Sequence, residues 1–413
     1  MKTLIEAPDI LHENIILPAS KSISNRALVI RALSGSSMPI ENISDCDDSS
    51  VVIDALRDMP PTIDIKAAGT AMRFLASMLA TVAGEHVITG TARMRNRPIS
   101  VLVDALRSLG ADIHYEEKEG FPPLRIRGRR LSGGKLVLKG NVSSQYISSL
   151  LMIGPTLAEG LSLELSGEIV SRPYIDMTLS IMRRFGARAE WVSDRVICVE
   201  PVPYTPIPYY IENDWSAASY WYEMVALSPD RNAAVTLPGL FPDSLQGDAS
   251  VARIFGDLGV ATCFDGNTVR ISKGEAARGE FACDMVEQPD LAQTVAVTCC
   301  LLGIRFRLTG LQTLRIKETD RMAALQRELG KLGFVVKTEG DGTLVWEGET
   351  DACTPTDNHI AIDTYDDHRM AMAFAPVSLL RTGIVINDPE VVSKSYPGFW
   401  NDLEKAGFKL TLL

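Results

Sequence analysis

The chain has 413 residues, enough for two or three domains with a substantial core. Its 41 lysines and arginines are outnumbered by 52 aspartates and glutamates, and the net charge of −11 argues against nucleic acid or an anionic membrane as the main partner. The seven cysteines are scattered without CxxC spacing, no signal-peptide pattern opens the sequence, and no apolar run could span a bilayer. We therefore expect a soluble, cytoplasmic protein without a disulfide scaffold or a zinc site.

The first predicted helix opens with an unusual number of hydrogen-bond donors. The stretch "LPASKSISNRALVIRALSG" has an apolar run that stops at a glycine, and Ser20, Ser22 or Ser24 could cap its start. Lys21 and Arg26 add positive charge to the end where the helix dipole is already positive. This arrangement favours the docking of an anion such as phosphate or carboxylate. A solvated cap with two surface cations is the equally weighted alternative.

An amphipathic helix that stops at a glycine before a strand recurs along the chain. The stop glycines stand at positions 110, 186, 259, 333 and 407, so the successive intervals are 76, 73, 74 and 74 residues. A sixth copy ends near Pro60, only 50 residues before Gly110. Chance similarity among amphipathic helices is the alternative, but the near-constant interval argues against it.

A second, more apolar series of helices interleaves with the first. Its members start near Ser20, Gly69, Ser143, Asp214, Asp290 and Asp367. Together with β-rich stretches such as "KLVLKG" and "RVICVE", the two series predict six α/β units, the first cut short between Pro60 and Gly69. The proline-rich stretch "PVPYTPIPYYIEND" predicts a boundary between two halves of three units each.

Several helix starts of the second series carry donors rather than acids. Arg73 and Arg369 lie in such first turns, and "NVSSQY" offers Ser143, Ser144 and Gln145. The first series adds Arg97, Arg321 and Lys394, each 12 or 13 residues before a stop glycine. If both halves turn the same ends toward one cleft, the cations around it would be Lys21, Arg97, Arg321, Arg369 and Lys394. That set suits a ligand with several negative charges, although each member taken alone could be a solvated surface cation.

Two carboxylates near these cations are candidates for proton transfer. In "LRIKETDRMAAL", Lys317 and Arg321 would share a helical face with Glu318 beside them, which an ordinary salt-bridged helix start also explains. Asp290 follows Pro289 at a helix start and could equally be a plain N-cap. The chain has no GxxxxGK[ST], GxGxxG, GxSxG or HExxH motif, so nucleotide, serine-hydrolase and zinc chemistries find no support.

The motifs together resemble one family of enolpyruvyl transferases. The matching stretches are "LPASKSISNRALVIRALS", "AAGTAMRFL", "RMRNRPISVLVDALRSLGA", "NVSSQYISSLLM", "SRPYIDMT", "IKETDRM" and "YDDHRMAMAF". In this order they look like the 5-enolpyruvylshikimate-3-phosphate (EPSP) synthase family, the 3-phosphoshikimate 1-carboxyvinyltransferases of the shikimate pathway. The resemblance implies an inside-out barrel of two domains, each of three α/β units, with the active site in the cleft between them. The domains would be 18–212 and 213–413, the latter completed by the strand 1–17.

The resemblance also implies a reaction and its residues. The enolpyruvyl group of phosphoenolpyruvate would pass to the 5-hydroxyl of shikimate 3-phosphate through a tetrahedral intermediate, with no metal or organic cofactor. The residues implied for catalysis are Asp290, which would accept the hydroxyl proton, Glu318, which would serve the methylene carbon, and Lys21. Those implied for phosphoenolpyruvate are Lys21, Gly69, Arg97, Gln145, Arg321, Arg369 and Lys394. Those implied for shikimate 3-phosphate are Ser22, Arg26, Ser143, Ser144, Gln145, Ser171, Tyr174, Asp290, Thr313 and Lys317.

The sequence departs from the family pattern in its first unit and at a few other positions. Ala67 and Thr313 stand where many members have asparagine, and Phe74 replaces a frequent proline. About two dozen residues that longer relatives carry after Pro60 are missing. Gly69 is similar to the glycine that leaves room for the inhibitor glyphosate in the family, which predicts sensitivity to that compound.

Two alternative hypotheses about the function compete with this one. The sibling enzyme that acts on UDP-N-acetylglucosamine usually has a loop cysteine five residues before an Arg-Pro pair, whereas Ala92 stands at that position before Arg97-Pro98. A non-catalytic repeat protein that binds polyanions would not need Asp290 and Glu318 beside its cations. Most members of the resembled family are monomers, and we expect the same here.

Overall fold

The computed structural model describes residues 1–275, 279–351 and 359–413, so Cys353 lies outside the described residues. The chain divides into two compact units, which are described separately. Unit 1 contains Met1–Pro18 and Glu212–Leu413, and unit 2 contains Ala19–Ile211. The second junction falls at the end of the proline-rich stretch, one residue before the position expected from the sequence.

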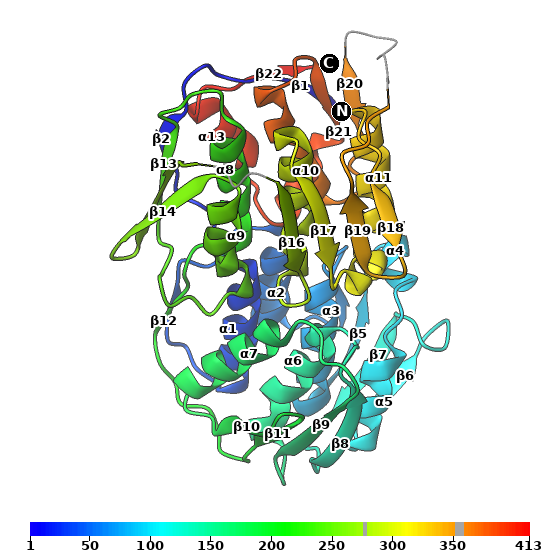
Figure 1. Ribbon diagram of the computed structural model, residues 1–413. Helices are drawn as coiled ribbons and strands as arrows, with labels where there is room; N and C mark the ends of the chain where they lie inside the picture. The colour runs from blue at the N-terminus through cyan, green and yellow to red at the C-terminus, as the bar shows by residue number, and fades with distance from the viewer. Residues whose placement is uncertain (276–278, 352–358) are drawn as a thin grey trace. The chain divides into compact units, whose positions relative to one another are not determined.

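Unit 2 is built on three helices that pack against one another (Figure 1). These core helices are α1 (Lys21–Leu33), α3 (Gly69–Thr81) and α6 (Ser144–Ile153). The outer helices are α2 (Asp47–Asp58), α5 (Ser100–Ser108) and α7 (Arg172–Arg184), with the short helix α4 (Ala92–Arg95) and the 3₁₀ turn η1 (Gly154–Thr156). From Ala71 to Ala80 every residue of α3 is buried, so this helix has no face left for solvent.

Two four-stranded sheets of unit 2 share one pattern of pairing. The first contains, in spatial order, β4 (Thr62–Asp64), β5 (Gly84–Thr89), β7 (Leu124–Gly128) and β6 (Asp112–Tyr115). The second contains β8 (Gly134–Lys139), β9 (Leu161–Ser166), β11 (Val196–Val199) and β10 (Ala189–Ser193). In both, the first pair is parallel and the next two pairs are antiparallel.

The first α/β unit keeps only a remnant of such a sheet. Within the described part of the chain, β3 (Ile40–Glu41) pairs in parallel with β12 (Tyr209–Tyr210), and no further strand joins them. This two-stranded ladder stands where each of the other units has four strands, and the shortened first unit stays a prediction.

Unit 1 repeats this plan. Its core helices, α8 (Trp215–Leu227), α10 (Ala292–Leu302) and α12 (His368–Phe374), pack against one another. Its outer helices are α9 (Val251–Asp257), α11 (Arg321–Lys331) and α13 (Phe399–Lys405). The 3₁₀ turns are η2 (Gly247–Ser250), η3 (Pro289–Leu291), η4 (Gln312–Ile316), η5 (Ala375–Leu379) and η6 (Pro389–Lys394).

Three sheets complete unit 1, each with the same parallel–antiparallel–antiparallel order. They are β2 (His12–Asn14), β13 (Ala234–Pro238), β15 (Thr268–Lys273) and β14 (Val260–Asp265); β16 (Glu280–Asp284), β17 (Arg305–Thr309), β19 (Thr343–Trp346) and β18 (Lys337–Glu339); and β20 (Ile360–Ile362), β21 (Ile384–Asn387), β1 (Lys2–Glu6) and β22 (Lys409–Leu412). The amino-terminal strands β1 and β2 thus belong to unit 1. The mixed α/β class predicted from the sequence is confirmed.

The stop glycines explain why five of the six described outer helices, all but α2, end where they do. Gly110, Gly186, Gly259, Gly333 and Gly407 have φ angles of 99°, 81°, 90°, 90° and 91°. Only glycine enters this left-handed region without strain, so each one turns the chain from a helix toward the strand that follows. None of the described helices combines the length and apolar composition needed to cross a membrane.

Candidate functional site

The predicted residues of unit 2 gather at the starts of its helices. Ser20, rather than Ser22 or Ser24, caps α1 by accepting a hydrogen bond from the Ile23 N–H at 3.5 Å. Ser143 caps α6 by accepting from the Gln145 N–H at 3.4 Å. No acidic residue occupies the first turn of α1, α3, α6 or α7. Because the positive helix ends meet no carboxylate in these turns, they suit an anionic ligand.

Arg26 on α1 is a buried cation without a carboxylate partner among the residues that the structure describes. Its guanidinium donates to Thr178 Oγ1 at 2.7 Å and to Ser148 Oγ at 3.1 Å, and it lies 5.3 Å from the centre of the Phe74 ring. Burial lowers the pKa of Arg26 to about 10. A cation held by hydroxyl groups and rings is incompletely compensated, so an anion that reached it would be bound strongly.

Gly69, Arg97 and Gln145 meet around the start of α3. A Cβ atom on Gly69 would stand 2.7 Å from Arg97 Nη1 and 3.1 Å from Arg73 Nη1. Arg73 Nη1 donates to the Gly69 carbonyl at 2.9 Å, and Gln145 Nε2 donates to Thr70 Oγ1 at 3.0 Å. The glycine therefore gives the Arg97 guanidinium room to lie against the helix start.

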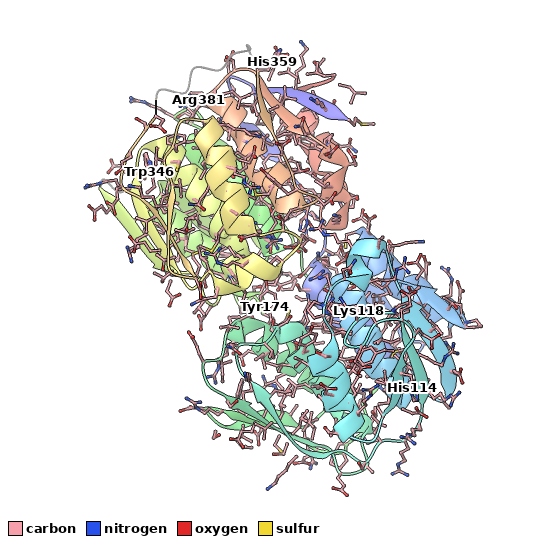
Figure 2. The ribbon with its side chains drawn as sticks, turned by 90° about the vertical axis from the view of Figure 1, so that its right-hand side faces the viewer. His114, Lys118, Tyr174, Trp346, His359 and Arg381 are labelled. Atoms are coloured by element: carbon pink, nitrogen blue, oxygen red, sulfur yellow. The ribbon has the colours of Figure 1, made fainter. Side chains whose placement is uncertain are left out.

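The remaining predicted residues of unit 2 lie at the same helix ends. Lys21, the first residue of α1, is 3.5 Å from the Asp48 carboxylate, measured from Nζ to Oδ2. Ser171 immediately precedes α7 and has a φ of 55°, a strained conformation for a residue with a side chain. Tyr174 lies in the first turn of α7 (Figure 2), and its carbonyl is 3.4 Å from Arg26 Nη2. Ser22 and Ser144 are in the first turns of α1 and α6.

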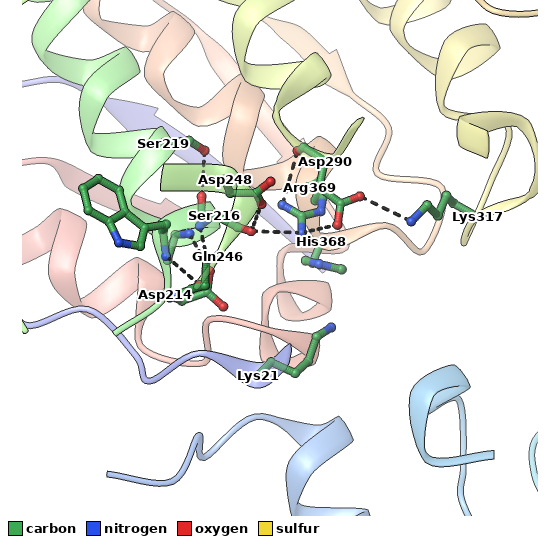
Figure 3. Close-up of polar contacts among 12 residues, drawn as sticks. Lys21, Asp214, Ser216, Ser219, Gln246, Asp248, Asp290, Lys317, His368 and Arg369 are labelled. Carbon is green, nitrogen blue, oxygen red and sulfur yellow. Dashed lines mark hydrogen bonds and ion pairs between the residues drawn. The ribbon is translucent and has the colours of Figure 1, made fainter. Parts of the chain in front are cut away.

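Asp290 is the centre of the predicted set in unit 1. Its Oδ1 accepts from Arg321 Nη1 at 2.9 Å. The same Oδ1 lies 3.5 Å from Lys317 Nζ, and Oδ2 accepts from Arg369 Nη2 at 2.9 Å (Figure 3). Neither η3 nor α10 has a side-chain cap. Asp290 is therefore not a plain N-cap, because its carboxylate is held by three cations instead.

Arg321 connects Asp290 to two more carboxylates. Its buried guanidinium donates to Asp367 Oδ2 at 2.6 Å and to Glu318 Oε2 at 2.8 Å. Burial by itself lowers the pKa of Arg321, but the charges of Asp367, Glu318 and Asp290 outweigh burial and raise it. We call the six residues linked in this way the Asp290 cluster: Asp290, Lys317, Glu318, Arg321, Asp367 and Arg369.

The predicted helical face shared by Lys317 and Arg321 is wrong. Helix α11 begins at Arg321, because Asp320 ahead of it has extended backbone and caps the helix by accepting from the Ala323 N–H at 3.1 Å. Lys317 lies before this cap and approaches Asp290 from a loop rather than from the helix. The two cations meet at a shared carboxylate, not through helical spacing.

Lys394 and Thr313 lie apart from the ion pairs of the cluster. Lys394, the last residue of η6, donates from Nζ to the Asp366 carbonyl at 2.6 Å. Thr313 lies in η4, and its buried hydroxyl has no hydrogen-bond partner among the described residues. Among the described residues, Thr313 makes no hydrogen bond to the Asp290 cluster. Its role in binding shikimate 3-phosphate therefore stays a prediction.

Sequence reasoning missed two carboxylates next to the site. Asp367, at the start of α12, accepts from Arg321 and from the Arg369 N–H, the latter at 2.9 Å. Asp248 in η2 accepts from the Ser216 hydroxyl. The position of Asp367 at a recurring helix start was a usable signal, whereas Asp248 follows no motif. Among the described residues, no group of three or more His, Cys, Asp or Glu side chains is arranged to hold a metal ion.

The fold and these two sets of residues define a class of α/β proteins of repeated units whose helix starts are equipped for anionic ligands. The family model for EPSP synthase (3-phosphoshikimate 1-carboxyvinyltransferase) matches residues 59–403. A 3-phosphoshikimate 1-carboxyvinyltransferase of Bacteroides fragilis is 55% identical over 99% of this chain and 98% of its own length. The corresponding proteins of Neisseria meningitidis and Vibrio cholerae are 37% and 35% identical, over 94% and 97% of this chain and 94% and 98% of theirs. The chain therefore belongs to the EPSP synthase family.

Solved structures agree on the fold. An EPSP synthase from Acinetobacter baumannii superimposes with a TM-score of 0.77, covering 100% of this chain and 99% of its own at 22% sequence identity. A second structure of the EPSP synthase from this organism gives a TM-score of 0.76 at 21% identity. At such identity the likeness bears on the fold alone.

Proposed function

We propose that the chain transfers the enolpyruvyl group of phosphoenolpyruvate to the 5-hydroxyl of shikimate 3-phosphate and releases phosphate. Membership of the EPSP synthase family supports this reaction, as do relatives of that name along nearly the whole chain. The observation that carries the proposal at the level of the site is Asp290, a carboxylate held by Lys317, Arg321 and Arg369.

In this proposal, cationic side chains and hydroxyl groups bind two anionic substrates. Phosphoenolpyruvate carries a carboxylate and a phosphate, and shikimate 3-phosphate carries one of each as well. Lys21, Gly69, Arg97 and Gln145 in unit 2, with Arg321, Arg369 and Lys394 in unit 1, receive phosphoenolpyruvate. In unit 2, Arg26 and the hydroxyl groups of Ser22, Ser143, Ser144, Ser171 and Tyr174 receive shikimate 3-phosphate, with Thr313 and Lys317 in unit 1. Hydrogen bonds between ionised partners contribute about 1.5–3 kcal/mol each.

Proton transfer in this proposal uses the two carboxylates. The 5-hydroxyl oxygen of shikimate 3-phosphate attacks C2 of phosphoenolpyruvate while Asp290 accepts the hydroxyl proton. Glu318 donates a proton to the methylene carbon C3. A tetrahedral intermediate results. Glu318 then takes a proton back from the new methyl group while the C2–O bond to phosphate breaks, and the departing phosphate takes the proton held by Asp290. Arg321 lies 2.8 Å from Glu318 and 2.9 Å from Asp290, so it keeps both carboxylates beside one cation throughout. Lys21 adds positive charge for the intermediate.

The test uses the purified protein with both substrates and follows the release of inorganic phosphate. Asp290→Asn keeps the shape of the side chain but cannot accept a proton, so we expect kcat to fall by about 10²–10⁴-fold. Asp257→Asn, an exposed site on α9, is the matched control and should turn over like the unchanged protein. An Asp290→Asn protein with normal kcat would remove Asp290 from the mechanism.

The choice of acceptor separates the rival readings. Phosphate release with UDP-N-acetylglucosamine and not with shikimate 3-phosphate would favour the sibling enzyme. Binding of phosphoenolpyruvate without release in the presence of either acceptor would favour a non-catalytic polyanion-binding protein.

We propose further that the protein works as a monomer in the cytoplasm. The six cysteines within the described ranges are free thiols, as a reducing compartment requires. Size-exclusion chromatography with light scattering should return the mass of one chain, 45.1 kDa.

A further inference from the structure

Helix α8 presents two hydroxyl groups to Arg369 of the Asp290 cluster: Ser216 at its start, and Tyr220, which accepts from Arg369 Nη1 at 3.5 Å. Every residue of α8 except Ser216 is buried. Asp214 fixes the first turn by accepting from the Ser216 N–H at 2.7 Å and from the Ala217 N–H at 3.2 Å. The Ser216 Oγ lies 3.5 Å from Arg369 Nη2, which is also the nitrogen that donates to Asp290 Oδ2 (Figure 3).

Asp248 accepts the hydrogen bond that the Ser216 hydroxyl group donates. The Ser216 Oγ donates to Asp248 Oδ2, and a serine has only one proton to give. The lone pairs of Ser216 are therefore left facing Arg369. Without an acceptor on the Asp248 side, the hydroxyl could rotate and turn its proton toward the guanidinium, which would repel it.

The 3₁₀ turn that carries Asp248 is anchored to α8. Gln246, just before η2, accepts from the Trp215 N–H through Oε1 at 3.1 Å and donates to the Asn213 carbonyl through Nε2 at 2.8 Å. Asp248 itself is 3% exposed, and its Oδ1 has no hydrogen-bond partner within the described residues. The carboxylate is thus held in a fixed place while half of its hydrogen-bonding capacity is unused.

The charged groups around Asp248 come from three neighbouring elements. Asp290 in η3 and Asp214 before α8 are negative, and Arg369 on α12 is positive. Burial, followed by the charge of Asp290, raises the pKa of Asp248 to about 6, although Arg369 and the Ser216 hydroxyl oppose this shift. A buried carboxylate next to a second carboxylate is unfavourable. Groups in such surroundings are often functional, which indicates a role for Asp248 beyond holding η2 against α8.

We propose that Asp248 is a positioning residue for the reaction, acting through the Ser216 hydroxyl to orient the Arg369 guanidinium between Asp290 and phosphoenolpyruvate. The inference rests on the proposed function for the identity of the ligand of Arg369. Asp248 touches neither substrate in this scheme. It fixes the direction in which the Ser216 hydroxyl points its proton. The Ser216 oxygen in turn holds the Nη2 group of Arg369.

The test compares steady-state kinetics of four variants. Asp248→Ala frees the hydroxyl group, so we expect the KM for phosphoenolpyruvate to rise about tenfold while kcat falls less than about threefold. Ser216→Ala should give the same rise. The double variant should add nothing further, because both residues act along one path. Asp248→Asn keeps an acceptor oxygen for Ser216 and should recover most of the loss.

A matched control and two outcomes make the test decisive. Asp257→Ala, at an exposed site on α9, should leave both constants unchanged. A lower unfolding temperature with an unchanged KM in Asp248→Ala would mean that the residue only holds η2 in place. Additive effects in the double variant would mean that Asp248 does not act through Ser216. Either result overturns the proposal.

A structural readout separates this inference from the proposed function. In a crystal structure of Asp248→Ala, we expect the Arg369 Nη2 to Asp290 Oδ2 distance, now 2.9 Å, to lengthen. An unchanged distance overturns the positioning role even if the protein proves to act on another acceptor. Failure of the unchanged protein to turn over shikimate 3-phosphate, with a lengthened distance in the variant, would refute the function and not the orientation of Arg369.

Discussion

At Gly69, the absence of a side chain leaves the Arg97 guanidinium its place. A methyl group there would stand 2.7 Å from Arg97 Nη1, and the flexible arginine would move away before the backbone did. We expect Gly69→Ala to raise the KM for phosphoenolpyruvate about tenfold or more and to lower sensitivity to glyphosate, measured by inhibition of phosphate release. Gly256→Ala, which meets no atom within 4 Å, is the control and should change neither value.

Unaffected turnover of the unchanged protein at saturating glyphosate would refute the predicted sensitivity. An unchanged KM in Gly69→Ala would show instead that Arg97 tolerates the displacement or does not bind phosphoenolpyruvate.

Arg26 offers a test of ligand binding that does not depend on turnover. Its buried charge has no carboxylate partner in the described part of the chain, so replacing it with an apolar side chain leaves no unpaired charge behind. We expect Arg26→Met to keep its unfolding temperature within about 3 °C without ligand. It should lose the rise in unfolding temperature that shikimate 3-phosphate gives the unchanged protein.

Arg184→Met, at an exposed position in the last turn of α7, is the matched control for Arg26. Equal stabilisation of both variants by shikimate 3-phosphate would count against Arg26 as a ligand-binding residue.

Single residues differed in how far the sequence could predict them. Arg26 and Asp290 stand at recurring helix starts, so their chemistry could be inferred from repetition. Asp248 could not be inferred, because its importance comes from contact with Ser216 and from the nearby charge of Arg369, which only tertiary packing creates. The face shared by Lys317 and Arg321 was wrong because the capping Asp320 starts the helix four residues after Lys317.

At the scale of elements, the glycine that ends five of the six described outer helices is the most predictable feature; α2 ends at Met59 instead. Gly110 has a φ of 99° and its Cβ would meet only Ser132 Oγ at 3.9 Å, so substitution there tests strain without a clash. We expect Gly110→Ala to lower the free energy of unfolding by about 1–2 kcal/mol. Gly330→Ala, inside α11 with no atom within 4 Å, should raise it by about 0.5–1 kcal/mol. Urea unfolding measures both, and equal effects of the two substitutions would contradict the conformational explanation.

Helices and their ends followed from periodicity and glycine spacing, whereas strand pairing did not. The parallel–antiparallel–antiparallel order of the five larger sheets depends on which distant segments meet, and short apolar runs such as "KLVLKG" carry no record of their partners. The two-residue ladder of β3 and β12 joins segments from opposite ends of unit 2, which local sequence could not indicate.

Across the described residues, the carboxyl groups whose pKa is clearly displaced differ between the two units. In unit 1, burial raises the pKa of Glu212, Glu223, Asp248 and Asp402, and Asp363 beside Lys331 is the exception with a lowered pKa. In unit 2, arginine or lysine neighbours lower the pKa of Asp58, Asp64, Glu85 and Glu116. The latter groups are largely exposed, so their effect on stability is small.

The sign of the resulting pH dependence follows from proton binding. A carboxyl whose pKa is raised on folding binds more protons in the native state between its two pKa values, so the free energy of unfolding falls as pH rises through that window. For Asp248 the window runs from 3.8 to about 6, and for Glu223 it starts at 4.5 and extends well above. We therefore expect the free energy of unfolding to fall between about pH 4 and pH 6 through Asp248, and Glu223 to extend the fall to higher pH.

Glu223→Gln should remove part of this loss and raise the free energy of unfolding at pH 8 by about 1–2 kcal/mol. Urea unfolding followed by tryptophan fluorescence measures it, since Trp215 and Trp221 lie on the same helix as Glu223. A variant with the same pH slope as the unchanged protein would rule out Glu223 as its source.

The placement of the amino-terminal strands has a consequence for biosynthesis. Ile5 pairs with Ile384 and Leu4 with Thr411, so during synthesis β1 must wait for strands that lie far along the sequence. At about 5–20 residues per second, that delay is tens of seconds, during which the uninterrupted segment Ala19–Ile211 is already complete and free to fold. Because the Leu413 N–H donates to the Lys2 carbonyl at 2.9 Å, the two ends of the polypeptide are neighbours. A circular permutant that joins them and opens between Pro18 and Ala19 would be synthesised as two consecutive domains. No strand of unit 1 would then be made before the whole of unit 2.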